Sequence, residues 1–119
     1  METVEFLILK NLLHNEEYVR KVIPFIKADY FENHNEKVVF EEILKFVEEY
    51  NQQATKEVLC IETEKRQDIN DESFKEVTQL IGSLEDEPTE FNWLVNTTEK
   101  WCRDRSIYLA LMESISLAD

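Results

Sequence analysis

Hydrophobic residues recur along this chain with the period of an α-helix, and short polar runs separate the repeats. Residues 2–13 are apolar around nearly the whole circumference of a helix, which is typical of a helix in the middle of a bundle. A second helix is expected to begin after Asn15, whose side chain can cap it, and to kink or end at Pro24. Its apolar face is predicted to hold Val19, Val22, Ile23 and Ile26.

The clearest amphipathic helix is predicted within residues 33–50. Asn33, followed three residues later by Glu36, resembles a capping box at its start. Beyond this start, the apolar positions repeat at helical spacing: Val39, Ile43, Phe46, Val47 and Tyr50. The opposite face is predicted to be polar and solvated: Glu41, Glu42, Lys45, Glu48 and Glu49.

Two shorter helices and one long helix complete the pattern. Thr55 can cap the first short helix, and Asp71 begins the second. The polar run at residues 62–73 between them is expected to be an exposed loop. Pro88 stands where the last helix could start, because its missing N–H would be unsatisfied there anyway. No breaker follows it, so this helix is expected to continue to the end of the sequence.

These elements predict an all-α fold, a compact bundle of about six helices with a long C-terminal helix. We expect residues 1–119 to form a single domain, because they can bury one core and no repeat or linker divides them. The chain has one glycine and two prolines. It therefore offers few places for the tight turns that a sheet needs.

Two large aromatic residues, Tyr30 and Phe31, stand side by side just before the third predicted helix. Packed inward, they would form the joint between two helices of the bundle. Left outside, they would be a docking point. Core packing is favoured, because aromatic side chains usually bury their large area. The predicted core joint has five members: Tyr30, Phe31, Val39, Phe40 and Ile43.

The last helix carries large apolar residues at intervals of seven, a seam that is typical of helix pairing. Beyond Ser106 the sequence is apolar on more than one face, and such a surface is more naturally buried than left in water. Two alternatives stay open: the seam packs within the chain, or it mediates self-association as a dimer or a higher oligomer. The candidate interface residues are Leu94, Trp101, Tyr108, Leu111, Met112 and Ile115.

The charge of the chain excludes one class of partner and favours another. Its 26 acidic and 13 basic residues give a formal net charge of −13, which would repel a phosphate backbone, so direct nucleic-acid binding is not expected. A protein partner is favoured instead. No signal segment or membrane span is evident, and Cys60 and Cys102 lack CxxC spacing. We therefore expect a cytosolic chain with two inert thiols and no membrane partner.

No constellation of residues indicates catalysis. His14 and His34 have no partner at i+4, so a metal pair is not expected, and the abundant carboxylates suggest a solvated surface. A phosphate-binding loop needs at least two glycines, and only Gly82 is available. We expect neither catalytic residues nor a cofactor or metal site in this chain.

Three sequence segments resemble the head domain of DnaB-type replicative helicases. ADYF followed by VVF and a long amphipathic helix is similar to the family's aromatic joint and the helix start after it. The run LIGSLEDEPTEFNWLVNTTEKWCRDR resembles the corresponding stretch in the replicative helicases of large tailed phages. The resemblance covers nearly all 119 residues and lies in the order and spacing of packing motifs.

The resemblance implies a helical head on a longer chain, followed by a linker and a RecA-like motor that holds ATP and magnesium. Heads of this family pair through a helical hairpin, form a collar on a hexamer and are linked to primase coupling. Trp101, Tyr108, Leu111, Met112 and Ile115 would lie in or near that hairpin. The motor is missing, so a fragment is expected, with the helicase activity in its parent, in the cytoplasm of an infected bacterium. Asn35 stands where bacterial heads often have a histidine.

A second hypothesis comes from another class of protein. A small acidic phage protein could inhibit a host DNA-binding enzyme by mimicking the charge of a duplex, and the net charge of −13 permits this. A reading frame that continues past Asp119 into a GxxxxGK[ST] motif would favour the helicase head.

Overall fold

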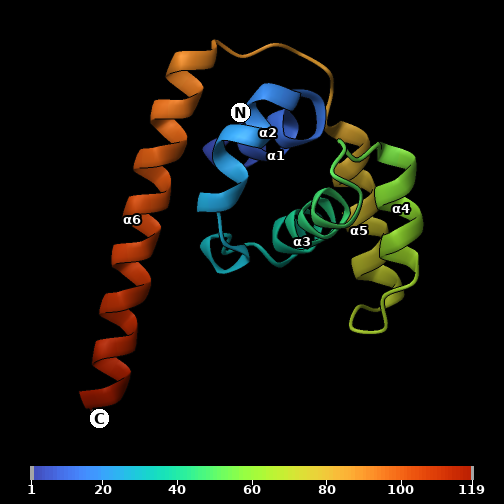
Figure 1. Ribbon diagram of the computed structural model, residues 1–119. Helices are drawn as coiled ribbons and strands as arrows, with labels where there is room; N and C mark the ends of the chain where they lie inside the picture. The colour runs from blue at the N-terminus through green and yellow to red at the C-terminus, as the bar shows by residue number, and fades with distance from the viewer. Residues whose placement is uncertain (1, 119) are drawn as a thin grey trace.

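Polar side chains fix where most of the helices begin. The computed structural model describes residues 2–118, and six α-helices follow one another within that range (Figure 1). They are α1 (Val4–His14), α2 (Glu16–Val22), α3 (His34–Tyr50), α4 (Lys56–Glu64), α5 (Asp71–Ser83) and α6 (Phe91–Ala118). The five residues that cap α1 to α5 each accept a hydrogen bond from the backbone N–H three residues later: Thr3, Asn15, Asn33, Thr55 and Asn70. Each bond satisfies an N–H that has no partner inside its helix.

Pro24 ends the second helix, as predicted. The α-helix stops at Val22, and residues Ile23–Phe25 continue as a 3₁₀ turn, η1. Proline has no N–H, and its ring clashes with the preceding helical turn, so the α-helix cannot continue. A second 3₁₀ turn, η2 (Ala28–Tyr30), leads toward α3.

Helix α1 lies in the middle of the fold, which confirms the prediction from its apolar circumference. It packs against α2, α3 and α6. Even two polar residues of α1, Lys10 and Asn11, are buried. The side-chain amide of Asn11 donates to the Leu7 carbonyl oxygen at 2.8 Å and to Thr89 Oγ1 at 3.1 Å. It thereby links α1 to the segment that leads into α6.

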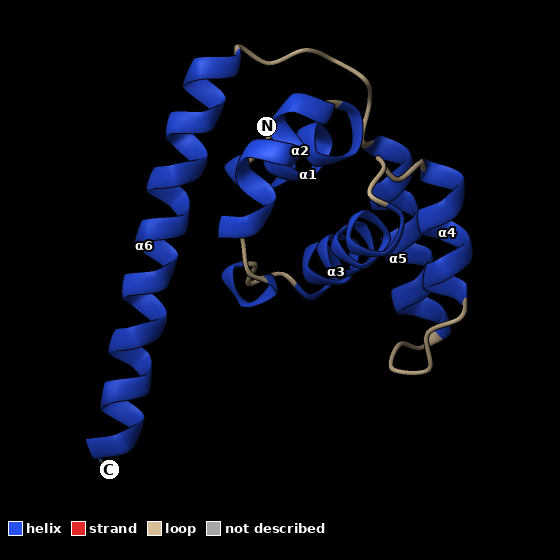
Figure 2. Cartoon of the chain, in the orientation of Figure 1, coloured by secondary structure: helices blue, strands red, loops and turns tan. Residues whose placement is uncertain are grey.

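The remaining helices form two groups on either side of α1. Helices α3, α4 and α5 pack against one another, and α6 packs against α1, α2 and η2. In Figure 1, α4 and α5 lie at one edge of the molecule and α6 at the other. Helices and connecting loops account for the whole described range, 2–118 (Figure 2). The predicted all-α fold with a long C-terminal helix is confirmed.

The polar loop between α4 and α5 is exposed over most of its length, as predicted, but it is shorter than predicted. Helix α4 continues to Glu64 and α5 begins at Asp71, so only residues 65–70 lie outside helices. Within them, the side chain of Arg66 is 16% exposed. Its guanidinium donates to three carboxylates, those of Glu41, Glu42 and Asp68, at distances from 2.6 to 3.1 Å. These bonds hold the loop against α3.

Two residues of α3 lie contrary to the prediction. Glu42 was expected on the solvated face but is 5% exposed, because Arg66 Nη1 donates to its Oε2 at 2.7 Å and neutralises its charge. Tyr50 was expected on the apolar face but is 56% exposed. It is the last residue of the helix.

The start of α6 also differs from the prediction. The helix begins at Phe91 and not at Pro88. The carboxylate of Glu90 accepts a hydrogen bond from the Trp93 backbone N–H at 2.6 Å, so Glu90 serves as the capping side chain. Within residues 2–118, no helix has both the length and the hydrophobicity needed to cross a membrane.

Candidate functional site

The aromatic joint faces inward. Tyr30 and Phe31 are 8% and 2% exposed, and Val39, Phe40 and Ile43 are fully buried. The Phe31 ring lies 4.9 Å from the Trp101 ring and 5.2 Å from the Phe40 ring, measured between centroids. Tyr30 meets Trp101 edge to face at 5.9 Å. The joint therefore connects the start of α3 to the middle of α6, which is the inward-packing alternative.

A buried hydrogen bond that the sequence analysis missed fixes α2 against α6. The hydroxyl groups of Tyr18 and Thr98 lie 2.6 Å apart, and Thr98 Oγ1 also donates to the Leu94 carbonyl oxygen at 2.8 Å. Because the Thr98 proton is used there, the Tyr18 hydroxyl is the donor. Burial raises the pKa of Tyr18 above its ordinary value. In the sequence, the burial of Tyr18 is indicated by its position next to Val19 on the inner face of α2.

The heptad seam of α6 divides into two parts. Leu94 is 1% exposed and Trp101 is half-buried against Tyr30 and Phe31, so both pack within this chain. They were among the predicted interface residues, but the bundle itself covers them. Tyr108 and Ile115, one and two heptads further along, are 47% and 57% exposed.

Arg105 marks the boundary between these parts. Its Nε donates to the Tyr30 carbonyl oxygen at 2.7 Å, and its Nη1 donates to Glu32 Oε1 at 3.0 Å. The guanidinium also lies 4.9 Å from the centroid of the Tyr108 ring, within reach of a cation–π interaction. The C-terminal part of α6 extends past the rest of the bundle (Figure 1).

The extended part of α6 carries an exposed apolar surface, which we call the tail stripe. Its members lie on one face of the helix, at spacings of three and four residues, and their side chains are 40–59% exposed. They are Tyr108, Leu111, Met112 and Ile115. Ile107 and Leu117 are also exposed, and Glu113 is the only charged residue between them. The stripe contains the four predicted interface residues that the bundle does not cover.

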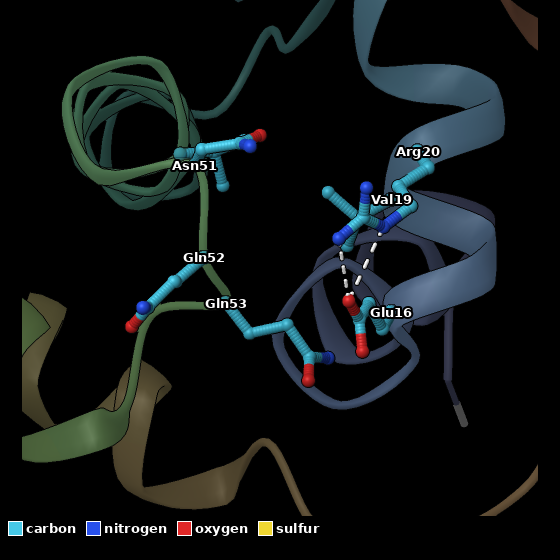
Figure 3. Close-up of a pocket in the computed structure, with 7 residues that line it drawn as sticks. Glu16, Val19, Arg20, Asn51, Gln52 and Gln53 are labelled. Atoms are coloured by element: carbon cyan, nitrogen blue, oxygen red, sulfur yellow. Dashed lines mark hydrogen bonds and ion pairs between the residues drawn. The ribbon is translucent and has the colours of Figure 1, made fainter.

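A hollow between α2 and the α3–α4 connection is built as a structural joint (Figure 3). Arg20 and Glu16 pair across one turn of α2 at 2.7 Å, and both are exposed. Asn51 ends α3 in the left-handed conformation, with a φ of 52°. Gln53 reaches toward the start of α2, where its amide oxygen can accept from the Glu16 N–H at 3.0 Å. Gln53 thereby holds the α3–α4 connection against the start of α2.

His14 has a structural role, whereas His34 is exposed at the start of α3. His14 Nε2 lies 2.6 Å from the Leu84 carbonyl oxygen and ties the end of α1 to the segment after α5. Burial and the nearby Glu99 raise the pKa of the Cys102 thiol to about 11, and burial also raises that of Cys60. The thiolate is the reactive form, so neither is activated at neutral pH. Among residues 2–118, no three His, Cys, Asp or Glu side chains are grouped to hold a metal ion.

Comparison with known proteins adds one relative. No family model matches the chain. The chain is similar to the DnaB-like replicative helicase of Enterobacteria phage T4, with 30% identity over 111 residues. The match covers 93% of this chain and 23% of that helicase. The similarity thus extends over nearly the whole helical bundle, and the chain spans about a quarter of the length of the relative.

Proposed function

We propose that this chain is the N-terminal head domain of a phage replicative DNA helicase of the DnaB type. The observation that carries this proposal is the 30% identity to the phage T4 DnaB-like helicase across 93% of the chain. Because the match spans only 23% of that helicase, we assign ATP, magnesium and DNA unwinding to other parts of a parent protein. In this proposal the head itself performs no catalysis and acts in the cytoplasm of the infected host.

The role proposed for the head is assembly of a collar, in which two copies pair through their tail stripes. The stripe offers four large side chains that are about half exposed, and burying the exposed half of each one contributes about 1 kcal/mol. Glu113 is the only charge between residues 107 and 117, so pairing there brings few charges out of water. The chain's charge of −13 opposes pairing, and salt screens that repulsion. Pairing should therefore strengthen as the salt concentration rises.

A second role, primase coupling, is proposed from the family resemblance. The acidic surface of the head would attract a basic partner and speed their encounter. The alternative of a charge-mimicking inhibitor requires the acidic surface but gives no reason for an exposed apolar stripe. The similarity to a helicase also favours the head domain.

The pairing proposal can be tested by the mass of the chain in solution, measured by light scattering across ranges of protein and salt concentration. We expect a species of twice the chain mass of 14.2 kDa that persists at high salt. Replacing Tyr108 and Leu111 with glutamate should return the chain to a monomer, because two charges would have to be buried in the interface.

A matched control adds the same two charges to the other side of the helix. Ser106 and Ala110 are exposed and lie on the face of α6 opposite the tail stripe, given 100° of rotation per residue. The variant Ser106→Glu/Ala110→Glu should still pair, and circular dichroism should show unchanged helix content in both variants. A monomer at every concentration, or equal loss of pairing in both variants, would contradict the proposed interface.

A further inference from the structure

A notch lies between the C-terminal half of α3 and α4. Helix α4 lies at the edge of the molecule opposite α6 (Figure 1). The enclosed volume of the notch is about 10 Å³, room for about one water molecule, so a larger group can enter only where a lining side chain moves aside. Five residues of α3 and one of α4 line this α3–α4 notch: Glu42, Lys45, Phe46, Glu49, Tyr50 and Glu62. Three of the six are carboxylates and two are aromatic, so the lining combines negative charge with the faces of two rings.

The floor of the α3–α4 notch is a buried carboxylate, and one of its oxygens accepts no hydrogen bond within the described part of the chain. Glu42 is 5% exposed, and its Oε2 accepts a hydrogen bond from Arg66 at 2.7 Å. Its Oε1 is also buried and has no hydrogen-bond partner among the described residues. The ammonium of Lys45 lies 3.8 Å from Oε1, which is too long for a hydrogen bond. A buried charged acceptor without a donor costs free energy, so a donor that entered the notch would be stabilised.

Lys45 is held loosely at the mouth of the notch. Its Nζ lies 3.8 Å from Glu42 and 3.8 Å from Glu62, and its side chain is 59% exposed. Neither contact is short enough to be a hydrogen bond, and the side chain has open solvent to move into. A cation that donates hydrogen bonds to these carboxylates could therefore displace the Lys45 ammonium. The second oxygen of Glu62 already pairs with Lys65 at 3.2 Å, which leaves the oxygen near Lys45 as an acceptor.

The wall of the notch is aromatic. The rings of Phe46 and Tyr50 lie 4.8 Å apart between centroids, and Tyr50 is 56% exposed. The face of an aromatic ring attracts a cation, most strongly where the cation is partly shielded from water. A guanidinium group suits this combination better than an ammonium group does. It is planar, stacks on aromatic rings, is weakly hydrated and can donate to two acceptors at once.

We propose that the α3–α4 notch is a docking site for an arginine side chain of a basic protein partner. The guanidinium displaces the Lys45 ammonium, donates to Glu42 Oε1 and lies against the Tyr50 ring. The net charge of −13 draws such a partner toward this surface. The inference rests on the geometry of the notch and stands apart from the helicase assignment and from pairing through the tail stripe.

The test is a titration of the ¹⁵N-labelled chain with three blocked tripeptides, followed by NMR chemical shifts. The peptides have arginine, lysine or citrulline between two glycines, and citrulline keeps the shape of arginine without its charge. We expect saturable shifts with the arginine peptide, centred on residues 42–50 and on Glu62. The lysine peptide should bind several-fold more weakly, and the citrulline peptide should cause no saturable shift.

Three variants make the test specific to the notch. Tyr50→Ala should weaken arginine binding several-fold, and Lys45→Met should strengthen it several-fold, because the competing ammonium is gone. Both side chains are more than half exposed, so neither change threatens the fold. Glu17→Gln, a charge removed from the exposed surface of α2, should leave binding unchanged. Equal binding of the arginine and lysine peptides, or no response to Tyr50→Ala and Lys45→Met, would overturn the proposal.

Discussion

In the first half of α6, Leu94 and Cys102 are 1% and 8% exposed, whereas in the second half Leu111 and Ile115 are 59% and 57% exposed. Both halves contain large apolar side chains at heptad spacing on one continuous helix. The difference is what surrounds them: α1, α2 and η2 pack against α6, and the C-terminal part of α6 extends past the bundle (Figure 1). A hydrophobic period thus predicts which face of a helix will be buried but does not identify the surface that buries it.

The largest expected effect comes from truncating matched leucines in the two halves. Leu94→Ala should lower the free energy of unfolding by about 2–5 kcal/mol, because it leaves a cavity in the core. Leu111→Ala should change it by no more than about 0.5 kcal/mol when the chain is monomeric, since its side chain is already in water. Urea denaturation at concentrations where light scattering gives a monomer will measure both. Equal losses would mean that the second half is also packed within the chain.

A smaller loss is expected at the hydrogen bond that fixes the first half of α6. Thr98→Val should cost about 1–3 kcal/mol, because the buried Tyr18 hydroxyl loses its acceptor. Adding Tyr18→Phe removes the orphaned hydroxyl, so the double variant should be more stable than Thr98→Val alone. A double-mutant cycle from urea denaturation gives the coupling. Purely additive effects would show that the two hydroxyl groups do not interact in solution.

The boundary between the halves should respond to Arg105→Ala. This change removes the hydrogen bonds to the Tyr30 carbonyl oxygen and to Glu32, at a cost of about 1 kcal/mol. We expect faster amide hydrogen exchange from residue 101 onward, with little change at Leu94. Glu32→Gln, which keeps the bond to Tyr30, is the control and should behave nearly as the unchanged chain. Protection that is unaltered near Trp101 would show that Arg105 does not anchor the helix.

The smallest effect concerns the Cys102 thiol, whose pKa is raised to about 11 in the folded chain. The unfolded chain loses this proton at a lower pH than the folded chain does. The thiol therefore stabilises the fold below its ordinary pKa, and this contribution is lost as the pH rises toward 11. Cys102→Ala should flatten the decline of thermal stability in that alkaline range. Identical pH profiles for both chains would indicate that the thiol titrates normally when folded.

Local signals in the sequence predicted much of the fold. Asn15, Asn33 and Thr55 were predicted to cap helices and do so, since a cap depends on residues only three positions apart. Pro24 ends its helix for a reason that is also local, because its ring clashes with the preceding helical turn. The aromatic pair at residues 30–31 packs inside, where the rings of Phe40 and Trp101 contact Phe31.

The features that the sequence did not predict depend on contacts between distant residues. Glu42 is buried because Arg66, 24 positions away, neutralises it, and a helical wheel of α3 alone cannot contain that information. The bond between Tyr18 and Thr98 spans 80 positions. The division of the heptad seam likewise depends on how far the bundle reaches along α6.

The continuity of α6 has a mechanical consequence. Its 28 residues contain neither glycine nor proline, so it forms a single rod of about 42 Å at 1.5 Å per residue. The N-terminal half of the rod is packed in the core through Leu94 and Trp101. A displacement of the part of α6 around Ile115 would therefore be transmitted along the helix to the contact between Trp101 and the aromatic joint, which includes Phe40 of α3.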